Sequence, residues 1–168
     1  MNIGTSITRE STMIGKKNNL GSNVITQIGF VVRDVEKSAS DFAEFFGVKK
    51  PGISITGPVE ETHAEYNGKP LEGKAKLAFF KFKNITIELI EPVDGPSTWQ
   101  DFLVAHGEGV HHIAFNTRDT KTKVESLASK NVPLVQRGDF KGGDYSYLDA
   151  TGPLKIIIEL LGSDVRKL

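Results

Sequence analysis

The sequence predicts an α+β domain built from two tandem modules, each with one strand, one helix and then further strands. The first observation is a repeat: residues 27–34, QIGFVVRD, align with residues 112–119, HIAFNTRD, and Ile, Phe, Arg and Asp recur in step. Residues 85–90, ITIELI, correspond in the same way to residues 156–161, IIIELL, and each copy carries a glutamate in the same slot. The third is an apolar pattern of helical spacing after the first segment of each copy.

In the first copy, a strand is expected over residues 25–32 and a helix over residues 34–46. Asp34 is placed to cap the start of the helix, because a short acidic side chain accepts hydrogen bonds from the first free backbone amides. Gly47 is placed to end it, since glycine readily adopts the left-handed conformation that closes many helices.

Two further strands of this copy are expected over residues 77–82 and 85–91, where β-branched and aromatic residues are dense. Before them the first copy has a stretch that the second copy lacks. This stretch, residues 57–76, contains the turn-forming pairs Asn67-Gly68 and Lys69-Pro70. It predicts an extended hairpin or a loop over a pocket.

The second copy follows a linker that contains Pro92, Gly95 and Pro96 and a short helix from Ser97, a plausible cap, to about His106. Its own elements are expected at residues 110–117 (strand), 120–130 (helix), 145–148 (strand) and 154–161 (strand). The chain therefore divides into a flexible tail (1–23) and a single domain (24–168), with module one at 24–92, the linker at 93–108 and module two at 109–162.

Composition narrows the classes of function. Lys plus Arg and Asp plus Glu both number 21, so the formal net charge is +0, and no excess positive field predicts nucleic acid or membrane as a partner. The absence of cysteine excludes thiol chemistry and cysteine-based zinc sites. The polar tail has no apolar run long enough for a signal peptide or a membrane span, which predicts a cytoplasmic protein.

Four polar side chains occupy equivalent slots in the two copies. Side chains alternate between the faces of a strand, so Gln27 shares a face with Gly29, and His112 shares one with Ala114. Glu88 and Glu159 interrupt apolar strands at matching positions. Modules packed about a pseudo-twofold axis would bring these slots into one cleft.

The four side chains form a donor set that suits a cation. An amide oxygen, an imidazole nitrogen and two carboxylates would neutralise one divalent ion and leave coordination positions open for water or substrate. Zn, Ni, Co, Mn, Fe and Mg all accept such ligands. The alternative interpretation is that Gln27 and His112 are simply solvated or hydrogen-bonded and that the glutamates face water on an open sheet.

Other polar and aromatic residues have less specific interpretations. For Glu60, Glu61 and His63 a charged, solvated hairpin is favoured over an acid–base role. His111 is expected on the strand face opposite His112, in a structural role, and His106 at a helix end. Gly107 and Gly109 lack the lysine and the strand-to-helix context of a phosphate loop. Trp99, Tyr145 and Tyr147 are candidates for lining the cleft, with core packing or a dimer contact as the default.

Residues 25–161 resemble the vicinal oxygen chelate superfamily, which includes glyoxalase I, methylmalonyl-CoA epimerases, extradiol dioxygenases and bleomycin-resistance proteins. The segments that carry the resemblance are QIGFVVRDVEKSASDFAEFFGV, KLAFFKFKNITIELIEP and STWQDFLVAHGEGVHHIAF, the last being similar to the matching stretch of methylmalonyl-CoA epimerases. The resemblance implies two βαβββ modules whose mixed sheet curls around a metal cleft. It places the metal ligands at Gln27, Glu88, His112 and Glu159.

The resemblance also implies a reaction class, in which one divalent metal ion chelates two neighbouring substrate oxygens and stabilises an enolate or enediolate. The carboxylate at the position of Glu159 takes the proton in glyoxalase I, so Glu159 is the first candidate for the catalytic base and Glu88 the second by module symmetry. The Gln, Glu, His, Glu order resembles glyoxalase I, but the residues after Glu88 depart from that family. Many epimerases have His at the position of Gln27.

The predicted function is that of a metal-dependent isomerase or lyase, epimerase-like or lactoylglutathione lyase-like, acting on a small oxo acid, hydroxy acid or acyl thioester. An extradiol dioxygenase is disfavoured, because Gln27 takes the place of one of the two histidines that it needs. The alternative from another class is a metal-free protein that sequesters a small molecule, of the bleomycin-resistance type. Members of this superfamily often dimerise, so a homodimer is expected, with sites that either lie within one chain or are shared between two.

Overall fold

The computed structural model describes residues 20–163, so most of the predicted tail and the last five residues lie outside the described part. Its elements, in chain order, are β1 (Gln27–Val31), α1 (Val35–Phe46), β2 (Ile53–Ile55), α2 (Val59–Thr62), β3 (Glu65–Tyr66), β4 (Lys69–Pro70), β5 (Ala75–Lys81), β6 (Thr86–Pro92), α3 (Thr98–His106), β7 (Gly109–Thr117), α4 (Thr120–Ala128), β8 (Leu134–Phe140), β9 (Gly143–Ala150), α5 (Thr151–Leu154) and β10 (Ile156–Ser163).

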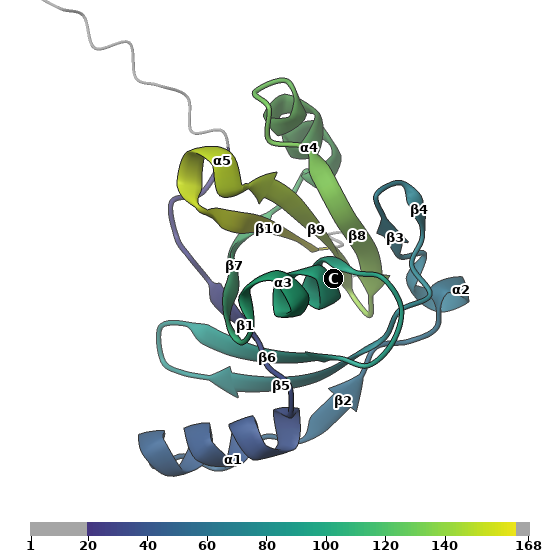
Figure 1. The fold of residues 1–168 in the computed structure, drawn as a ribbon. Coiled ribbons are helices and arrows are strands. Elements are labelled where there is room, and N and C mark those ends of the chain that lie inside the picture. Colours follow the sequence, from purple (N-terminus) through teal and green to yellow (C-terminus); the bar gives the residue numbers. More distant parts are fainter. Residues whose placement is uncertain (1–19, 164–168) are drawn as a thin grey trace, which may run out of the picture.

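Within the described residues, all strands join one mixed, curled sheet in the order β2-β5-β6-β1-β7-β10-β9-β8-β3-β4 (Figure 1). At its centre β1 runs antiparallel to β7. Each of these two strands has a parallel neighbour on its other side, β6 beside β1 and β10 beside β7. The α+β class and the curled mixed sheet are therefore as the sequence predicts, while the exact division into modules stays a prediction.

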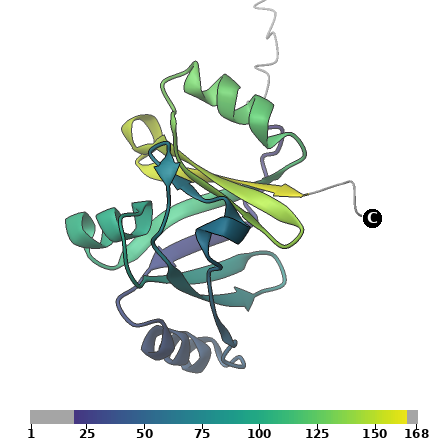
Figure 2. The same ribbon diagram turned by 90° about the vertical axis from the view of Figure 1, so that its right-hand side faces the viewer.

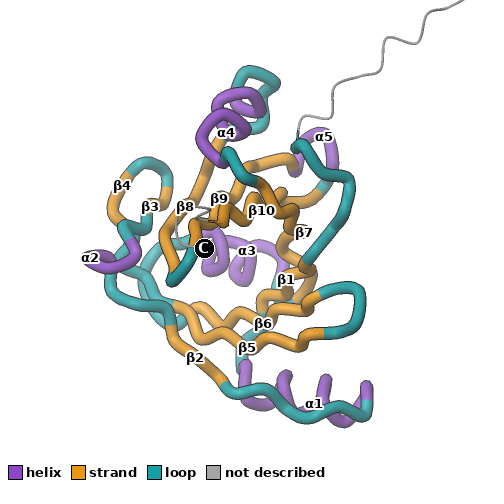
Figure 3. The backbone as a smooth tube through the Cα atoms, turned by 180° about the vertical axis from the view of Figure 1, so that it is seen from behind, coloured by secondary structure: helices purple, strands orange, loops and turns teal. Residues whose placement is uncertain are grey.

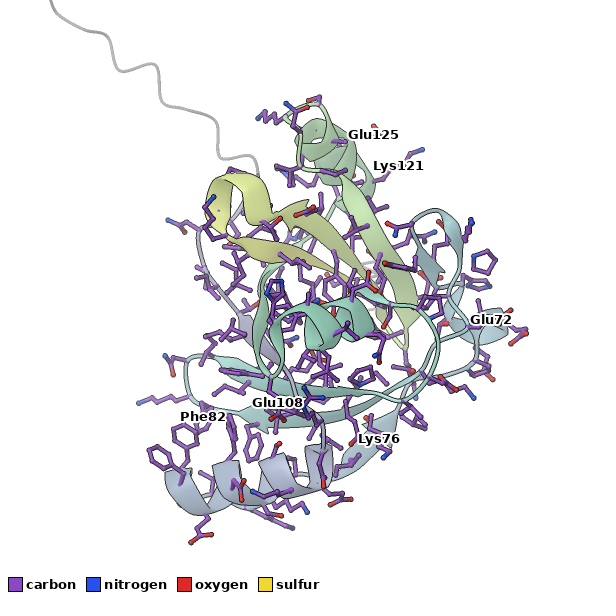
Figure 4. The ribbon with its side chains drawn as sticks, in the orientation of Figure 1. Glu72, Lys76, Phe82, Glu108, Lys121 and Glu125 are labelled. Atoms are coloured by element: carbon purple, nitrogen blue, oxygen red, sulfur yellow. The ribbon has the colours of Figure 1, made fainter. Side chains whose placement is uncertain are left out.

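Helix α1 covers the outer face of the first half of the sheet. Asp34 accepts a hydrogen bond from the Lys37 amide, and Gly47 ends the helix in the left-handed conformation with φ of 64°, so both predicted caps are confirmed. The helix buries Val35 and Ala39 against β5 and β6. Phe82, which follows β5, extends towards α1, as Figure 4 shows.

Helix α4 covers the outer face of the second half in the same way (Figure 2). Leu127 of this helix packs against Phe115, Leu148 and Ile158 of the sheet. Its exposed side carries Lys121 and Glu125, which point outward in Figure 4. The helix is shorter at its C-terminal end than the predicted 120–130, because Asn131 adopts a φ of 60° after a final turn.

Helix α3 lies on the opposite, concave side of the sheet, between the two halves (Figures 1 and 2). Ser97 caps it by accepting from the Gln100 amide, as predicted. Trp99 points from this helix into a third apolar cluster, which includes Val31, Ile90 and Tyr147. The concave side is thus partly filled by a helix that contacts strands of both halves.

The long stretch of the first copy crosses to the second half of the sheet. It forms the short helix α2 and the hairpin β3–β4, and β3 pairs with β8 (Figure 3). Asn67 and Gly68 both have positive φ, which is the conformation of a tight hairpin turn. The predicted hairpin is therefore present, and it extends the far edge of the sheet. No helix in residues 20–163 is long and apolar enough to cross a membrane.

Candidate functional site

The four predicted ligands come from the four central strands: Gln27 from β1, Glu88 from β6, His112 from β7 and Glu159 from β10. Across the central pair, Gly29 lies opposite His112 and Ala114 opposite Gln27. The same two small residues are paired on their other sides with Glu88 and Glu159. The register is therefore symmetric about the β1–β7 seam, and it brings all four side chains to one place on the concave face.

Their polar atoms lie within hydrogen-bonding distance. Gln27 Nε2 donates to Glu88 Oε2 at 2.8 Å and to Glu159 Oε2 at 3.3 Å, and it lies 3.5 Å from His112 Nε2. His112 Nε2 is 3.1 Å from Glu159 Oε2 and 3.4 Å from Glu88 Oε2. One ligand atom from each of Glu88, His112 and Glu159 lies within 4.8 Å of the others.

Burial makes it costly for the side chains of this cluster to carry charge, and it shifts their pKa values. All four side chains are buried, and His112 is 0% exposed. Burial raises the pKa of Glu88, and the charge of Glu159 adds to the increase. Burial alone would lower the pKa of His112, but the charges and hydrogen bonds of Glu159 and Glu88 raise it to about 9. Without a metal ion, a protonated His112 is thus the cation that balances the carboxylates.

Gly29 makes room for the imidazole of His112. A Cβ at this position would lie 2.0 Å from Cε1 and 2.5 Å from both ring nitrogens of His112. The ring therefore passes directly over the glycine backbone. The sequence places Gly29 on the same face as Gln27, but the need for a missing side chain follows only from the contact across the strands.

The strand face expected for His111 is wrong, whereas its structural role stays a prediction. The register of β1 and β7 shifts between Gly29 and Phe30, so that His111 sits in a β-bulge rather than on the far face. Its Nδ1 lies 3.0 Å from Nδ1 of His112, and burial lowers its pKa, with the charge of His112 contributing. Neutral His111 can therefore accept the Nδ1 proton of His112, which leaves Nε2 as the atom that faces the carboxylates.

The site opens into a cavity of about 840 Å³ lined by Gln27, Glu88 and Glu159 together with Trp99, Tyr145 and Tyr147. Trp99 Nε1 donates to the Tyr147 hydroxyl at 3.2 Å, and both side chains are almost fully buried. The three aromatic residues named from the sequence therefore line the cleft and also belong to the packed cluster around it.

The remaining polar candidates lie at the periphery. Glu60, Glu61 and His63 are exposed on or just after α2, and His63 Nδ1 lies 3.0 Å from Asp139 Oδ2. Glu61 also lines the cavity, which sequence reasoning did not anticipate. His106 is the last residue of α3, as expected, and is followed by Gly107.

The arrangement fits a divalent cation. Two buried carboxylates and an imidazole nitrogen converge on one point, and within residues 20–163 the charge that balances them is a proton on His112. The Gln27 amide nitrogen donates to both carboxylates, and rotation of the amide by 180° would turn its oxygen, an atom that can bind a metal, towards a cation. Oxygen and nitrogen donors of this kind suit borderline and hard divalent ions.

The sequence matches a known family and one curated relative. The model of the Glyoxalase/Bleomycin resistance protein/Dioxygenase superfamily matches residues 26–148. A relative from Bacillus subtilis (strain 168), the uncharacterized protein YqjC, is 30% identical over 92 residues, which are 53% of this chain. The chain spans 66% of the length of that relative.

Solved structures share the fold. The hypothetical protein BH1468 from Bacillus halodurans C-125 superposes with a TM-score of 0.59 at 17% identity, over 83% of this chain and 94% of its own. A methylmalonyl-CoA epimerase in complex with methylmalonyl-CoA and NH4+ gives 0.58 at 18%, over 84% and 95%. The epimerase from Mycobacterium tuberculosis gives 0.57 at 16%, over 90% and 93%. At such identities the likeness establishes the fold alone.

Proposed function

The chain belongs to the Glyoxalase/Bleomycin resistance protein/Dioxygenase superfamily, and from that premise we propose that it is a divalent-metal-dependent isomerase or lyase. Its substrate would be a small oxo acid, hydroxy acid or acyl thioester from which a proton is removed next to a carbonyl group. The observation that carries the proposal is the convergence of Glu88, His112 and Glu159, all buried, with Glu88 and Glu159 lining a cavity of about 840 Å³.

Gln27, Glu88, His112 and Glu159 would hold the metal, one ion per site. The bound ion would supply a Lewis acid that polarises the substrate carbonyl and stabilises the enolate or enediolate. Glu159 is the proposed base, because its carboxylate lies in the cavity and has Nε2 of His112 at 3.1 Å to orient it. Glu88 is its counterpart on the other side; in its protonated form it would donate its own proton to the opposite face of the planar intermediate, while Glu159 keeps the proton that it removed.

One observation favours a second candidate, a metal-free protein that sequesters a small molecule. Gln27 donates to both carboxylates and His112 lies beside them, so the cluster can be satisfied by its own hydrogen bonds and one proton. In that case the cavity would bind its ligand without chemistry, and the buried polar cluster would serve only to hold the two halves of the sheet together.

Elemental analysis of the dialysed chain decides between these candidates. We expect about one divalent ion per chain, and its loss in both Glu159→Gln and His112→Ala, because each removes a donor from a buried site. Glu60→Gln and His106→Ala are matched controls in exposed positions and should retain the ion. A chain that holds no ion after reconstitution with Zn, Ni, Co, Mn, Fe and Mg would contradict the enzymatic proposal.

The proposed assembly is a homodimer, as in many members of the superfamily. Light scattering at micromolar concentration would test it, with a mass of twice 18.4 kDa as the expected result. A monomeric mass would contradict this part of the proposal without affecting the metal site, because all four ligand candidates lie on one chain.

A further inference from the structure

The larger part of the cavity wall is apolar, although polar and charged side chains also line it. Leu77, Phe79 and Leu161 face it, as do the rings of Tyr145 and Tyr147. The tyrosine hydroxyls already have partners: that of Tyr147 accepts from Trp99, and that of Tyr145 accepts from Gln136 Nε2 at 3.4 Å. Each hydroxyl still has a proton to donate, so each tyrosine offers a ligand the apolar face of its ring and one hydrogen-bond donor.

The cavity is also long. Tyr147 pairs with Glu159, and from there β9 runs back to Gly143 and to the turn that holds Lys141, another lining residue. At about 3.4 Å per residue of strand, this turn lies roughly 15 to 20 Å from the carboxylates. A ligand head held at Glu159 would have the rings of Tyr147 and Tyr145 and the side chain of Leu161 beside its body, with Asp139 and Lys141 at the far end.

The charged residues that line the cavity outside the buried cluster do not suit a ligand with several negative charges. Lys141 is the one cation among the described lining residues, and two carboxylates, Glu61 and Asp139, line the cavity as well. Phosphates are usually recognised by clusters of Arg and Lys or by the N-termini of helices. With one lysine and two acidic groups, this cavity would repel the phosphates of a nucleotide-bearing thioester.

We propose that the substrate is an elongated 2-oxo or 2-hydroxy acid with an aliphatic or aryl body, rather than a coenzyme A thioester. The assignment of its head rests on the proposed function, whereas the assignment of its body rests on the walls alone. The two vicinal oxygens of such an acid match a metal centre with open positions, and the body matches the rings of Phe79, Tyr145 and Tyr147.

Trp99 provides a direct measurement of occupancy, because it is the single tryptophan of the chain and lines the cavity. The Zn²⁺-loaded chain is titrated with 2-oxobutanoate, 2-oxohexanoate and 2-oxooctanoate while Trp99 fluorescence is recorded. We expect affinity to rise about fourfold for each added methylene group. Coenzyme A at millimolar concentration should not displace 2-oxooctanoate. Equal affinities across the series, or displacement by coenzyme A, would overturn the proposal.

A matched pair of variants tests whether the dependence of affinity on ligand length arises in the cavity. Leu161→Ala should weaken 2-oxooctanoate binding by about tenfold and leave 2-oxobutanoate unchanged, because Leu161 lines the cavity beside Tyr145, two residues beyond Glu159 on β10. Leu154→Ala removes the same side chain from a position that is 60% exposed, outside the cavity, and should change neither affinity. Equal losses in both variants would count against the cavity as the binding site.

Measuring the metal content of the chain distinguishes a failure of this proposal from a failure of the proposed function. A chain that binds Zn²⁺ but shows no dependence on chain length would overturn the apolar specificity and leave the metal site intact. A chain without metal that binds octanoate and 2-oxooctanoate equally, each more tightly than its shorter homologue, would support the apolar wall of the cavity as the binding surface and contradict the enzymatic function.

Discussion

At the residue scale, the site depends on a glycine as much as on its charged groups. The ring of His112 occupies the space where a side chain at position 29 would begin. The sequence suffices to identify the four ligand candidates, because they recur in step in two aligned copies. It does not reveal the role of Gly29, since that role comes from a contact between strands that are far apart in the chain.

Gly29→Ala should therefore abolish most metal binding, because the new Cβ would lie 2.0 Å from Cε1 of His112 and force the imidazole away from the carboxylates. Metal content after dialysis and a zinc titration would measure the loss, with far-UV circular dichroism to check folding. Gly52→Ala is the matched control, because nothing lies within 4 Å of a Cβ there. Retention of normal zinc affinity by a folded Gly29→Ala chain would contradict this account.

His111 is a positioning residue in this structure. The bulge that brings its Nδ1 to 3.0 Å from Nδ1 of His112 has no marker in the sequence, where strict alternation puts the two histidines on opposite faces. In the metal-loaded chain, an acceptor at Nδ1 of His111 would hold the one proton of His112 on Nδ1 and leave Nε2 for the ion. Groups that orient a metal-ligating histidine in this way commonly change metal affinity when they are removed.

His111→Phe should lower zinc affinity by about tenfold to a hundredfold, because it keeps an aromatic ring against Phe102 and Tyr147 but removes the acceptor. Competitive titration against a chelator measures the affinity, and nitrogen NMR shifts report which His112 nitrogen carries the proton. His106→Phe is the control, because His106 also contacts Phe102 but is remote from His112 Nδ1. Unchanged affinity and an unchanged proton position in His111→Phe would exclude the positioning role.

At the element scale, local sequence patterns predict an element correctly where its own residues stabilise it. Helices α1 and α3 have side-chain caps at the expected positions, Asp34 and Ser97. The sequence did not predict β8, because its residues LVQRGDF mix charge and glycine. Of its two partners, β9 follows directly, but β3 lies much earlier in the chain. The short helix α5 also replaces the predicted start of the last strand, and ends at Lys155 with φ of 63°.

The stretch from α2 to β4 is anchored as part of the wall of the cavity. Leu71 is 4% exposed and packs with Ala64, Trp99 and Tyr147. Tyr66 of β3 donates a hydrogen bond to Asp101 of α3, which ties the hairpin to the helix. These contacts identify the stretch as a fixed element of the concave side.

Leu71→Ala should lower the free energy of unfolding by about 2–5 kcal/mol, the usual cost of truncating a buried leucine. Urea denaturation followed by circular dichroism gives this value. The same substitution at Leu154, which is 60% exposed, should change stability by less than about 0.5 kcal/mol. Similar, small effects at both positions would show that the stretch is not packed as described.

At the scale of the whole molecule, three apolar clusters hold the two halves of the sheet. One lies under α1, one under α4, and the third fills the concave side around Trp99. The charged cluster sits beside the third, where the strands of both halves meet. The location of this cluster could be inferred from the repeat in the sequence. The cavity could not, because its walls come from several separate segments of the chain between Gln27 and Leu161.

The buried histidine and glutamates link the stability of the molecule to pH. The pKa of His112 is raised from 6.5 to about 9, so in the metal-free chain the folded state holds a proton that the unfolded state releases. The stabilisation is complete below pH 6.5 and is lost as the pH rises to about 9, which corresponds to about 3 kcal/mol. The raised pKa of Glu88 acts in the same direction.

A bound divalent ion should reverse this pH dependence, because it takes the place of the proton between the carboxylates. We therefore expect the chelator-treated chain to lose stability from pH 6.5 to 9 in urea denaturation, and the zinc-loaded chain to gain stability relative to it as the pH rises. His112→Gln should flatten the metal-free profile, since it removes the group that titrates. A metal-free stability that is constant or rises over this interval would show that His112 is not held as a cation by Glu88 and Glu159.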